Sequence, residues 1–308
     1  MADDDPVTVI AEPFAIVPPE LQRLGESSRW AAEVLGVDSV GSFLEGPTFG
    51  PDGTLYVSDL AHGRIFLISP AGHIVDTLEC GDHPNGLAFH ADGRLFIADY
   101  GRGILALVPG ADTPTPVVTK YRYEPFRGVS DLVFAADGTL YFTDQGQSDL
   151  RFPTGRLFRW SAANGLTLLM DGIASPNGVA LSPDGRTLYM AVTRANCVYR
   201  VPLRPDRSLG KVGIFLYAAG GSGGPDGLAV DEGGTLAVAQ FGLGRVSLFD
   251  PLGRLTAVVI TPAGLGTTNV AYGGDDRRSL YITEVDSGSV FRARVDNPGL
   301  ALFGDPRN

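Results

Sequence analysis

A short pattern recurs six times along this chain of 308 residues. Each copy has one polar residue, then an apolar stretch and, seven positions after the polar residue, a tight turn that is usually Asp-Gly. Copies that lie 40 to 49 residues apart, with several apolar strands and no helical period, are typical of a β-propeller in which each repeat forms one blade. We therefore predict an all-β fold, a six-bladed β-propeller. The polar residues of the copies, here called the register residues, are Glu45, Asn85, Ser130, Asn177, Asp226 and Asn269.

The repeat occupies most of the chain, which predicts one propeller domain over residues 41–308 and an N-terminal arm, residues 1–40, packing on it. Within the arm, apolar residues between Pro19 and Leu35 have roughly helical spacing, so a short helix and an ordered arm are both open. Two segments are candidates for the outer strand that closes blade six. They are the residues before Phe43 and the tail from Gly299 to Phe303.

The chain is acidic, with a formal net charge of −11 and an isoelectric point near 4.8. Such a charge repels polyanions, so we expect neither nucleic acid nor a membrane surface as a partner. The first thirty residues lack the pattern of a signal peptide, and no stretch approaches the roughly 20 apolar residues of a membrane span, which favours a cytoplasmic location. Cys80 and Cys197 fall on different blades, so we expect no disulfide.

The register residues are predicted to meet around the propeller axis, because the innermost strand of every blade runs beside the central channel. Glu45, Asp226 and Asp131 would then bring carboxylates next to asparagine amides. Clustered carboxylates repel one another unless a cation neutralises them, and a ligand set made only of oxygens favours Ca²⁺, with Mg²⁺ and Mn²⁺ as alternatives. Asn and Asp before Gly are also ordinary turn formers, and this alternative stays open for Asn85 and Asn269.

Four motifs stand at the predicted entries of inner strands: Leu44-Glu45-Gly46-Pro47, Ser130-Asp131, Pro176-Asn177-Gly178-Val179-Ala180 followed by Ser182-Pro183-Asp184, and Pro225-Asp226-Gly227. Together they resemble the family of the senescence marker protein, gluconolactonase and luciferin-regenerating enzymes, over roughly residues 41 to 295. The resemblance implies a six-bladed propeller with one divalent metal in its central channel. It also implies that the ligands are Glu45, Asp131, Asn177 and Asp226.

Blade three departs from the sugar lactonases of that family. They carry Asn-Asp-Gly with an arginine two residues before the asparagine, whereas this chain has Ser130-Asp131 with Arg127 three residues before the serine. The departure favours Asp131 over Ser130 as the ligand. It also makes a polyhydroxylated lactone a less secure substrate.

The predicted activity is metal-dependent hydrolysis of a small-molecule lactone, in which a carboxylate activates the attacking water and the metal polarises the carbonyl. Asp131 and Asp226 are alternative general bases. A phosphotriesterase-type hydrolase and a non-enzymatic interaction platform are the alternative functions. The residues expected to contact the substrate are Asn85, Ser130, Arg127, Asn269, His83 and Phe152.

Overall fold

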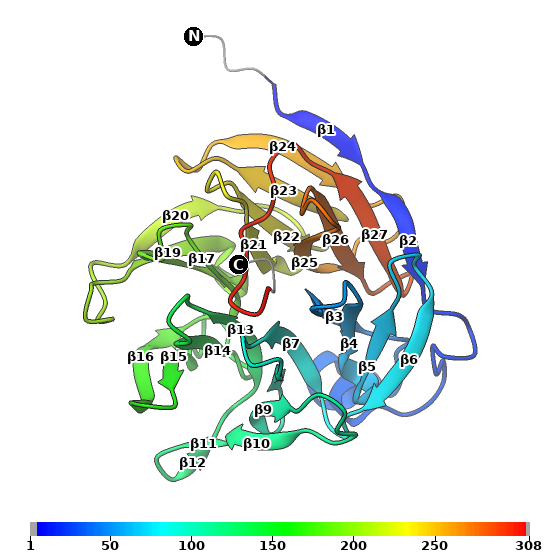
Figure 1. Cartoon of the computed structure of the whole chain (residues 1–308), viewed down its shortest axis with the longest axis horizontal. Coiled ribbons are helices and arrows are strands. Elements are labelled where there is room, and N and C mark those ends of the chain that lie inside the picture. Colours follow the sequence, from blue (N-terminus) through cyan, green and yellow to red (C-terminus); the bar gives the residue numbers. More distant parts are fainter. Residues whose placement is uncertain (1–4, 306–308) are drawn as a thin grey trace.

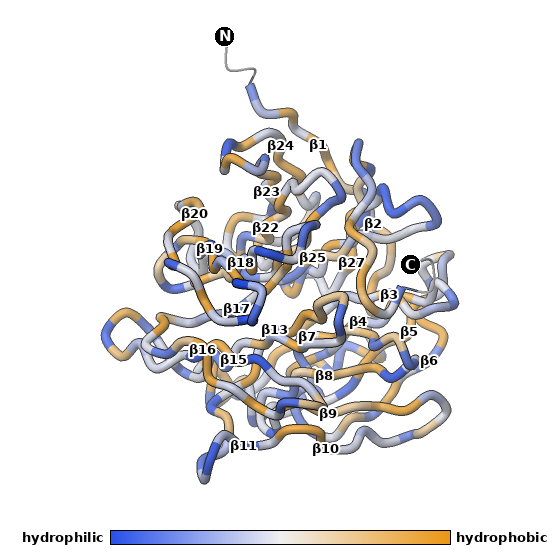
Figure 2. The backbone as a smooth tube through the Cα atoms, turned by 60° about the vertical axis from the view of Figure 1, so that its left-hand side comes forward, coloured by the Kyte–Doolittle hydropathy of each residue, from blue (hydrophilic) through white to orange (hydrophobic). Residues whose placement is uncertain are grey.

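Six blades surround a central axis in the computed structural model, which describes residues 5–305 (Figure 1). In each blade the strands pair antiparallel and in chain order, starting from the axis, apart from the two N-terminal strands that join blades five and six. Apolar residues follow the strands, whereas hydrophilic residues gather in the turns that connect them (Figure 2). The predicted six-bladed propeller is confirmed.

The blades follow one another along the chain. Blade one contains β3 (Leu44–Phe49), β4 (Leu55–Asp59), β5 (Arg64–Ile68) and β6 (Ile74–Glu79), and blade two contains β7 (Pro84–Phe89), β8 (Leu95–Asp99), β9 (Gly103–Leu107) and β10 (Thr115–Val118). Blade three contains β13 (Val129–Phe134), β14 (Leu140–Asp144), β15 (Gly155–Ser161) and β16 (Gly165–Ile173), and blade four contains β17 (Pro176–Leu181), β18 (Thr187–Val192), β19 (Cys197–Pro202) and β20 (Gly213–Tyr217). Blade five contains β21 (Gly224–Val230), β22 (Leu236–Phe241), β23 (Arg245–Phe249) and β24 (Leu255–Ile260), and blade six contains β25 (Thr267–Gly273), β26 (Ser279–Glu284) and β27 (Ser289–Arg294). Smaller elements are the hairpin of β11 (Lys120–Tyr121) and β12 (Glu124–Pro125) and the short helices η1 (Ala31–Leu35), η2 (Leu60–His62) and η3 (Thr193–Ala195).

The N-terminal segment closes the ring of blades. Strand β2 (Glu12–Ile16) pairs with β27 and becomes the outermost strand of blade six. Strand β1 (Val7–Ile10) pairs in parallel with β24 and adds a fifth strand to blade five. Of the two candidates for closure, the segment before Phe43 is therefore the one that supplies the strand.

Apolar side chains fill the space between neighbouring blades. Phe96 of blade two packs in one cluster with Phe142 and Phe158 of blade three, whose rings stack with centroids 5.3 Å apart. Cys80 and Cys197 are both buried and free, as expected.

Every inner strand carries a β-bulge near its start. In blade one the pairing register shifts between Glu45 and Thr48, and the other blades shift at the equivalent place. A bulge leaves a residue unpaired and re-aims the local side chains, so the six bulges set the positions of the groups at the axis. We call the side where the inner strands begin the mouth face. The opposite side, which carries the turns between first and second strands, is the hairpin face.

The arm that links β2 to β3 is ordered and lies on the mouth face. In Figure 1 it is the blue segment that passes behind blade one. Its only helical stretch within residues 5–43 is η1, which ends at Gly36 with a φ of 72°. A helix through the whole interval from Pro19 to Leu35 is prevented by the positive φ of Arg23 and Gly25. In the described part of the chain no helix has the length and apolar character needed to cross a bilayer.

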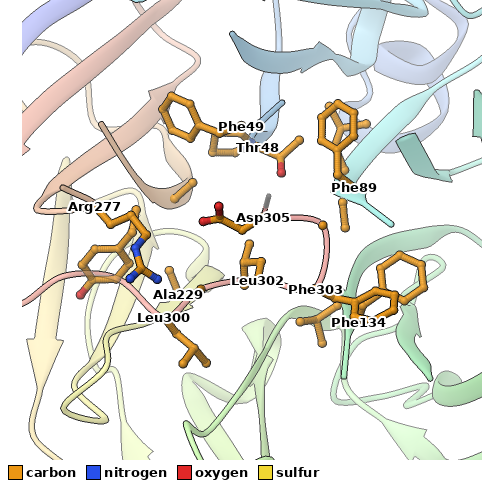
Figure 3. Close-up of a pocket in the computed structure, with 18 of the residues that line it drawn as sticks. Thr48, Phe49, Phe89, Phe134, Ala229, Arg277, Leu300, Leu302, Phe303 and Asp305 are labelled. Carbon is orange, nitrogen blue, oxygen red and sulfur yellow. The ribbon is translucent and has the colours of Figure 1, made fainter. Parts of the chain in front are cut away.

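The C-terminal tail crosses the hairpin face. It leaves blade six beside blade five, where Gly299 bridges to Asp231, and reaches Phe303 on the far side of the axis. The ring centroid of Phe303 lies 4.9 Å from that of His90 and 5.7 Å from that of Phe134. Beneath the tail is a cavity of about 1760 Å³ that is lined by the inner strands of all six blades (Figure 3). The tail therefore connects blades five and six to blades two and three.

Candidate metal and substrate site

Six polar residues lie at one level around the axis on the mouth side, and we call them the axial ring. Their level follows from strand pairing, because the residue before each of them pairs with the end of the second strand of its blade, as Leu44 pairs with Asp59 and Thr267 with Glu284. Five of the six are register residues. The axial ring consists of Glu45, Asn85, Ser130, Asn177, Asp226 and Thr268.

Asn269 lies one residue beyond the axial ring, so the predicted register was wrong by one residue in blade six. The cause is a longer hairpin ladder. In blade six the pairing extends to Gly273 and Ser279, whereas in blade three it ends one pair earlier, at Phe134 and Leu140. Counting back from the turn therefore reaches Asn269 instead of Thr268.

The position after the axial ring is glycine in four blades, and it is Asp131 in blade three and Asn269 in blade six. Each of these two side chains packs against the glycine of the preceding blade. A Cβ added to Gly86 would clash with Asp131 Oδ1, and one added to Gly227 would clash with Asn269 Oδ1. Gly86 and Gly227 are thus required by close approach at the axis, and not by turn formation.

Hydrogen bonds join members of the site across blades. The Ser130 hydroxyl donates to Asn177 Oδ1 at 2.7 Å, and Asn85 Nδ2 donates to Ser130 Oγ at 3.4 Å. On the other side of the axis, Asn269 Nδ2 donates to Glu45 Oε2 at 3.1 Å. Asn85 and Asn269 both lie inside strands and bond to axial-ring residues, which gives them a role other than that of turn formers.

The three acidic side chains of the site differ in their partners. Both carboxylate oxygens of Asp131 accept backbone N–H groups, Oδ1 from Leu132 and Oδ2 from Val179, each at 2.9 Å. Glu45 Oε2 accepts from the backbone of Gly46 at 3.1 Å. Asp226 Oδ1 is buried and finds no hydrogen-bond donor within residues 5–305.

Burial dominates the electrostatics of these groups. It raises the pKa of Glu45 to about 7, and the charge of Asp131 adds to the rise. It raises the pKa of Asp131 to about 6 against the opposing effect of the two backbone N–H groups. The pKa of Asp226 is raised well above its ordinary value, first by burial and then by the charges of Glu45 and Asp131. The three carboxyl groups are thus close enough to repel one another when ionised.

This arrangement fits a hard cation on chemical grounds. It offers carboxylate and amide oxygens, it concentrates negative charge, and it leaves Asp226 Oδ1 without a partner in the described residues. Within residues 5–305, no three His, Cys, Asp or Glu side chains are grouped so as to hold a metal by themselves. A cation at the axis would therefore also need the amide oxygen of Asn177.

The remaining predicted substrate residues stand on mouth-face loops around the axial ring. Arg127 Nη1 donates to the carbonyl of Thr154 at 2.6 Å, so its guanidinium is bound to the long loop of blade three. His83 Nδ1 lies 3.2 Å from the carbonyl oxygen of Leu60. Phe152 is 65% exposed. Within residues 5–305, none of these three side chains forms a hydrogen bond with an axial-ring residue.

One residue near the site and one buried residue of the arm were missed by sequence reasoning. Arg194, in η3, is close enough for its charge to lower the pKa of Asp226. A signal for it exists, because it follows the end of the second strand of blade four by two residues. Trp30 lies in the arm, outside every repeat, and is 4% exposed. No pattern in the sequence marks its position.

The fold and the site together define a class: six-bladed propellers that present carboxyl and amide groups on their axis. Residues 24–286 match the family model described as the SMP-30/Gluconolactonase/LRE-like region. The chain belongs to this family, as its motifs suggested.

The individual relatives share only moderate sequence identity with this chain. The chain is 36% identical over 161 residues to 6-deoxy-6-sulfogluconolactonase of Pseudomonas putida, a match that spans 48% of this chain and 55% of that protein, or just over half its length. It is 30% identical over 242 residues to lactonase drp35 of Staphylococcus aureus (strain MRSA252), which covers 74% of this chain and 73% of that protein. Among solved structures, the calcium-binding protein regucalcin of Agrobacterium tumefaciens has a TM-score of 0.74 at 23% identity, over 95% of this chain and 97% of that chain. The last similarity concerns the fold alone.

Proposed function

We propose that this chain is a divalent-metal-dependent lactonase whose metal lies on the propeller axis. The observation that carries the proposal is the meeting of three buried carboxyl groups from three blades, those of Glu45, Asp131 and Asp226. A buried acceptor without a donor costs roughly 1–3 kcal/mol, and more when it is charged, so Asp226 Oδ1 favours a bound cation. The names of the two curated relatives, both lactonases, and of the calcium-binding neighbour support the same conclusion.

The ligands in this proposal are Glu45, Asp131, Asn177 and Asp226. An oxygen-only set of this kind favours Ca²⁺, with Mg²⁺ or Mn²⁺ as alternatives. When bound, the cation would polarise the lactone carbonyl as a Lewis acid. Glu45 is held by Asn269 and the backbone of Gly46, and Asp131 by two backbone N–H groups, so both carboxylates keep their orientation without help from a substrate.

A carboxylate of the site also moves the proton. As water attacks the acyl carbon, Asp131 or Asp226 accepts a proton from the water, and the acyl carbon–oxygen bond of the ring then breaks. The proton passes to the alkoxide that leaves, which gives a hydroxy acid. Because both Asp131 oxygens already accept backbone N–H groups, Asp226 has more freedom at Oδ1, whereas Asp131 is better fixed.

The substrate is held by polar groups beside the ligands. Ser130 and Asn85 form one hydrogen-bonded chain with Asn177, and Asn269 stands next to Glu45, so these side chains are the proposed contacts to the lactone oxygens. Arg127, His83 and Phe152 are proposed to border the substrate from the mouth loops.

The test combines metal removal with one matched pair of variants. Hydrolysis of δ-valerolactone, glucono-δ-lactone and dihydrocoumarin is followed with a pH indicator, with paraoxon in parallel. We expect EDTA to abolish lactone hydrolysis and added Ca²⁺, Mg²⁺ or Mn²⁺ to restore it. Asp226→Asn should remove the metal response, whereas Asp231→Asn, at a buried aspartate just beyond the other end of β21, should keep it.

Unchanged lactone hydrolysis after thorough chelation would contradict the metal mechanism. Turnover of paraoxon without any lactone would instead favour a phosphotriesterase. If no ester is hydrolysed by the metal-loaded protein, the enzymatic proposal fails and the interaction platform remains.

A further inference from the structure

Two blades share a contact between the end of the second strand and the backbone that leads into the inner strand. In blade one, Asp59 Oδ1 accepts the backbone N–H of Phe43 at 2.9 Å. In blade three, Asp144 Oδ1 accepts the backbone N–H groups of Arg127 at 2.7 Å and of Gly128 at 2.8 Å. Each carboxylate thus holds the chain two residues before an axial-ring residue. We call Asp59 and Asp144 the clamp carboxylates.

The other oxygen of each clamp carboxylate belongs to a buried ion pair. Asp59 Oδ2 accepts from Arg64 Nε at 2.9 Å and from its Nη2 at 2.8 Å. Asp144 Oδ2 accepts from Arg156 Nε at 2.8 Å and also from its Nη2. Both carboxylates are fully buried, and Arg64 and Arg156 are 2% and 4% exposed. The arginines therefore fix the carboxylates so that Oδ1 stays directed at the entering backbone.

The β-bulges make an outside contact important at these places. In blade three the pairing of β13 with β14 shifts between Val129 and Leu132, and the Asp131 backbone N–H donates to the Thr143 hydroxyl at 3.2 Å instead of to a ladder carbonyl. Residues in a bulge lie outside the regular ladder, so the ladder alone does not fix their backbone. A clamp on the entering backbone fixes the end of this segment that faces the mouth.

Blade six has a related contact. Glu284 Oε1 accepts the backbone N–H of Gly266 at 3.0 Å, three residues before Asn269. The side chain of Asn269 in turn donates to Glu45 Oε2 at 3.1 Å. A carboxylate that holds the entering backbone is thus found in the blades that carry Glu45, Asp131 and Asn269.

Blade two provides the contrast. Asp99 is fully buried at the end of the second strand and pairs with Arg102, whose Nη2 lies 2.8 Å from Asp99 Oδ2. Its Oδ1, however, accepts the backbone N–H groups of Gly101 at 3.1 Å and of Arg102 at 2.8 Å. Both lie in the turn that follows its own strand. Asp99 therefore holds its own turn and not the start of an inner strand, and its blade supplies Asn85, which is not a proposed ligand.

Stability alone does not explain the two clamp ion pairs. Removing a carboxylate and a guanidinium from water is costly, and an apolar pair of similar volume is often at least as stable. A buried pair can instead serve to fix one geometry. The backbone that these two pairs fix leads to Glu45 and to Asp131.

We propose that Asp59 and Asp144 are positioning residues for the axial metal, which set the places of Glu45 and Asp131 without touching the metal or the substrate. The inference rests on the proposed metal-dependent function and adds two residues that lie outside the axial ring. The ion pairs with Arg64 and Arg156 keep the carboxylates in place, so the ligands need little rearrangement when a cation binds. Partners behind a metal ligand commonly contribute to metal affinity in this way.

The test compares the metal affinities of two matched double variants. Asp144→Leu/Arg156→Met replaces the clamp ion pair of blade three by apolar side chains, and Asp99→Leu/Arg102→Met makes the same change in blade two. Each leaves two backbone N–H groups without their carboxylate acceptor. In calorimetric titrations with Ca²⁺ we expect the blade-three variant to bind about 10- to 100-fold more weakly than the parent protein. The blade-two variant should bind Ca²⁺ as tightly as the parent.

Two further measurements distinguish a positioning role from a loss of folding. Circular dichroism shows whether each variant is folded at the temperature of the titration. If Asp144→Leu/Arg156→Met does not fold, Asp144→Asn is compared with Asp99→Asn, because one asparagine oxygen cannot serve both the backbone and the arginine. Hydrogen exchange of the Arg127 and Gly128 amides should be faster in the blade-three variants and unchanged in the blade-two variants.

The titrations contain no substrate, so they separate the inference from the proposed activity. Equal Ca²⁺ affinities in the parent and both variants, or equal weakening in both variants, would overturn the inference and leave the proposed function standing. A parent protein that binds no Ca²⁺, Mg²⁺ or Mn²⁺ would overturn the metal mechanism and the positioning role together. Weaker binding in the blade-three variant alone, with no lactone hydrolysed by the parent, would support the inference and remove the proposed activity.

Discussion

Replacing Glu45 by Gln should stabilise the metal-free protein at high pH. Burial and the charge of Asp131 raise the pKa of Glu45 from 4.5 to about 7, which corresponds to about 3 kcal/mol against ionisation at about 1.36 kcal/mol per pKa unit. Below pH 4.5 the residue is protonated in both folded and unfolded states, so no penalty exists. As pH rises to about 7, the unfolded state loses its proton first, and the metal-free wild type becomes less stable.

Glu45→Gln keeps an oxygen for the N–H groups of Gly46 and Asn269 but never ionises. In EDTA we therefore expect the variant and the wild type to have equal free energies of unfolding near pH 4.5. Above pH 8 the variant should be more stable by about 3 kcal/mol, or roughly 6 °C in melting temperature. At a Ca²⁺ concentration of 100 times Kd the wild type should gain about 2.7 kcal/mol and the variant much less. Thermal unfolding followed by circular dichroism across pH 4.5 to 8.5 measures all of these.

Glu284→Gln is the matched control. This second fully buried glutamate accepts hydrogen bonds from the backbone of Gly266 and Asp286 and from Ser287, so an amide there places an N–H against donors and should lower stability. The reasoning is refuted if Glu45→Gln is no more stable than wild type in EDTA at pH 8.5, or if it shows the same gain at pH 4.5.

Three further outcomes follow from the site and its surroundings. Asn177→Ala should weaken Ca²⁺ binding in calorimetric titrations, whereas Asn85→Ala should mainly raise KM; equal loss of Ca²⁺ affinity in both would mean that Asn85 is also a ligand. Arg194→Gln should tighten Ca²⁺ binding by about 2- to 5-fold, because an exposed cation beside Asp226 opposes a second one, and weaker binding would contradict this reading. Removal of residues 299–308 should lower the free energy of unfolding by roughly 2 kcal/mol, because the packing of Phe303 is lost. The value of kcat/KM should not change if substrates enter at the mouth face. A large change in kcat/KM would indicate entry through the hairpin-face cavity.

The number of blades and their order could be predicted because each repeat carries its own turn and apolar strands. The strand that closes blade six could not, since β2 belongs to no repeat and its sequence, Glu12-Pro13-Phe14-Ala15-Ile16, has no mark that distinguishes it from the tail. Pairing with β27 decides between them, and that is a contact between segments that lie far apart in the sequence.

The same limit applies to the site. Glu45, Asn177 and Asp226 were located because their repeats share one length, and Asn269 was misplaced because blade six has one additional strand pair. Asp131 was singled out by chemistry, but its fixation by the backbone of Leu132 and Val179 depends on the neighbouring blade. Trp30 reaches the mouth only through the path of the arm, which no local pattern encodes.

Strand β2 and the arm that follows it have a consequence for how the protein is made. During synthesis, residues 12–16 precede their partner strand, residues 289–294, by almost the whole propeller. Until that strand is made, blade one lacks blade six as its neighbour. The arm also lacks its contact with blade six, the hydrogen bond from Val17 to Gly288. A chain that stops before blade six therefore has no closed ring of blades. The complete site forms only after blade six has been synthesised.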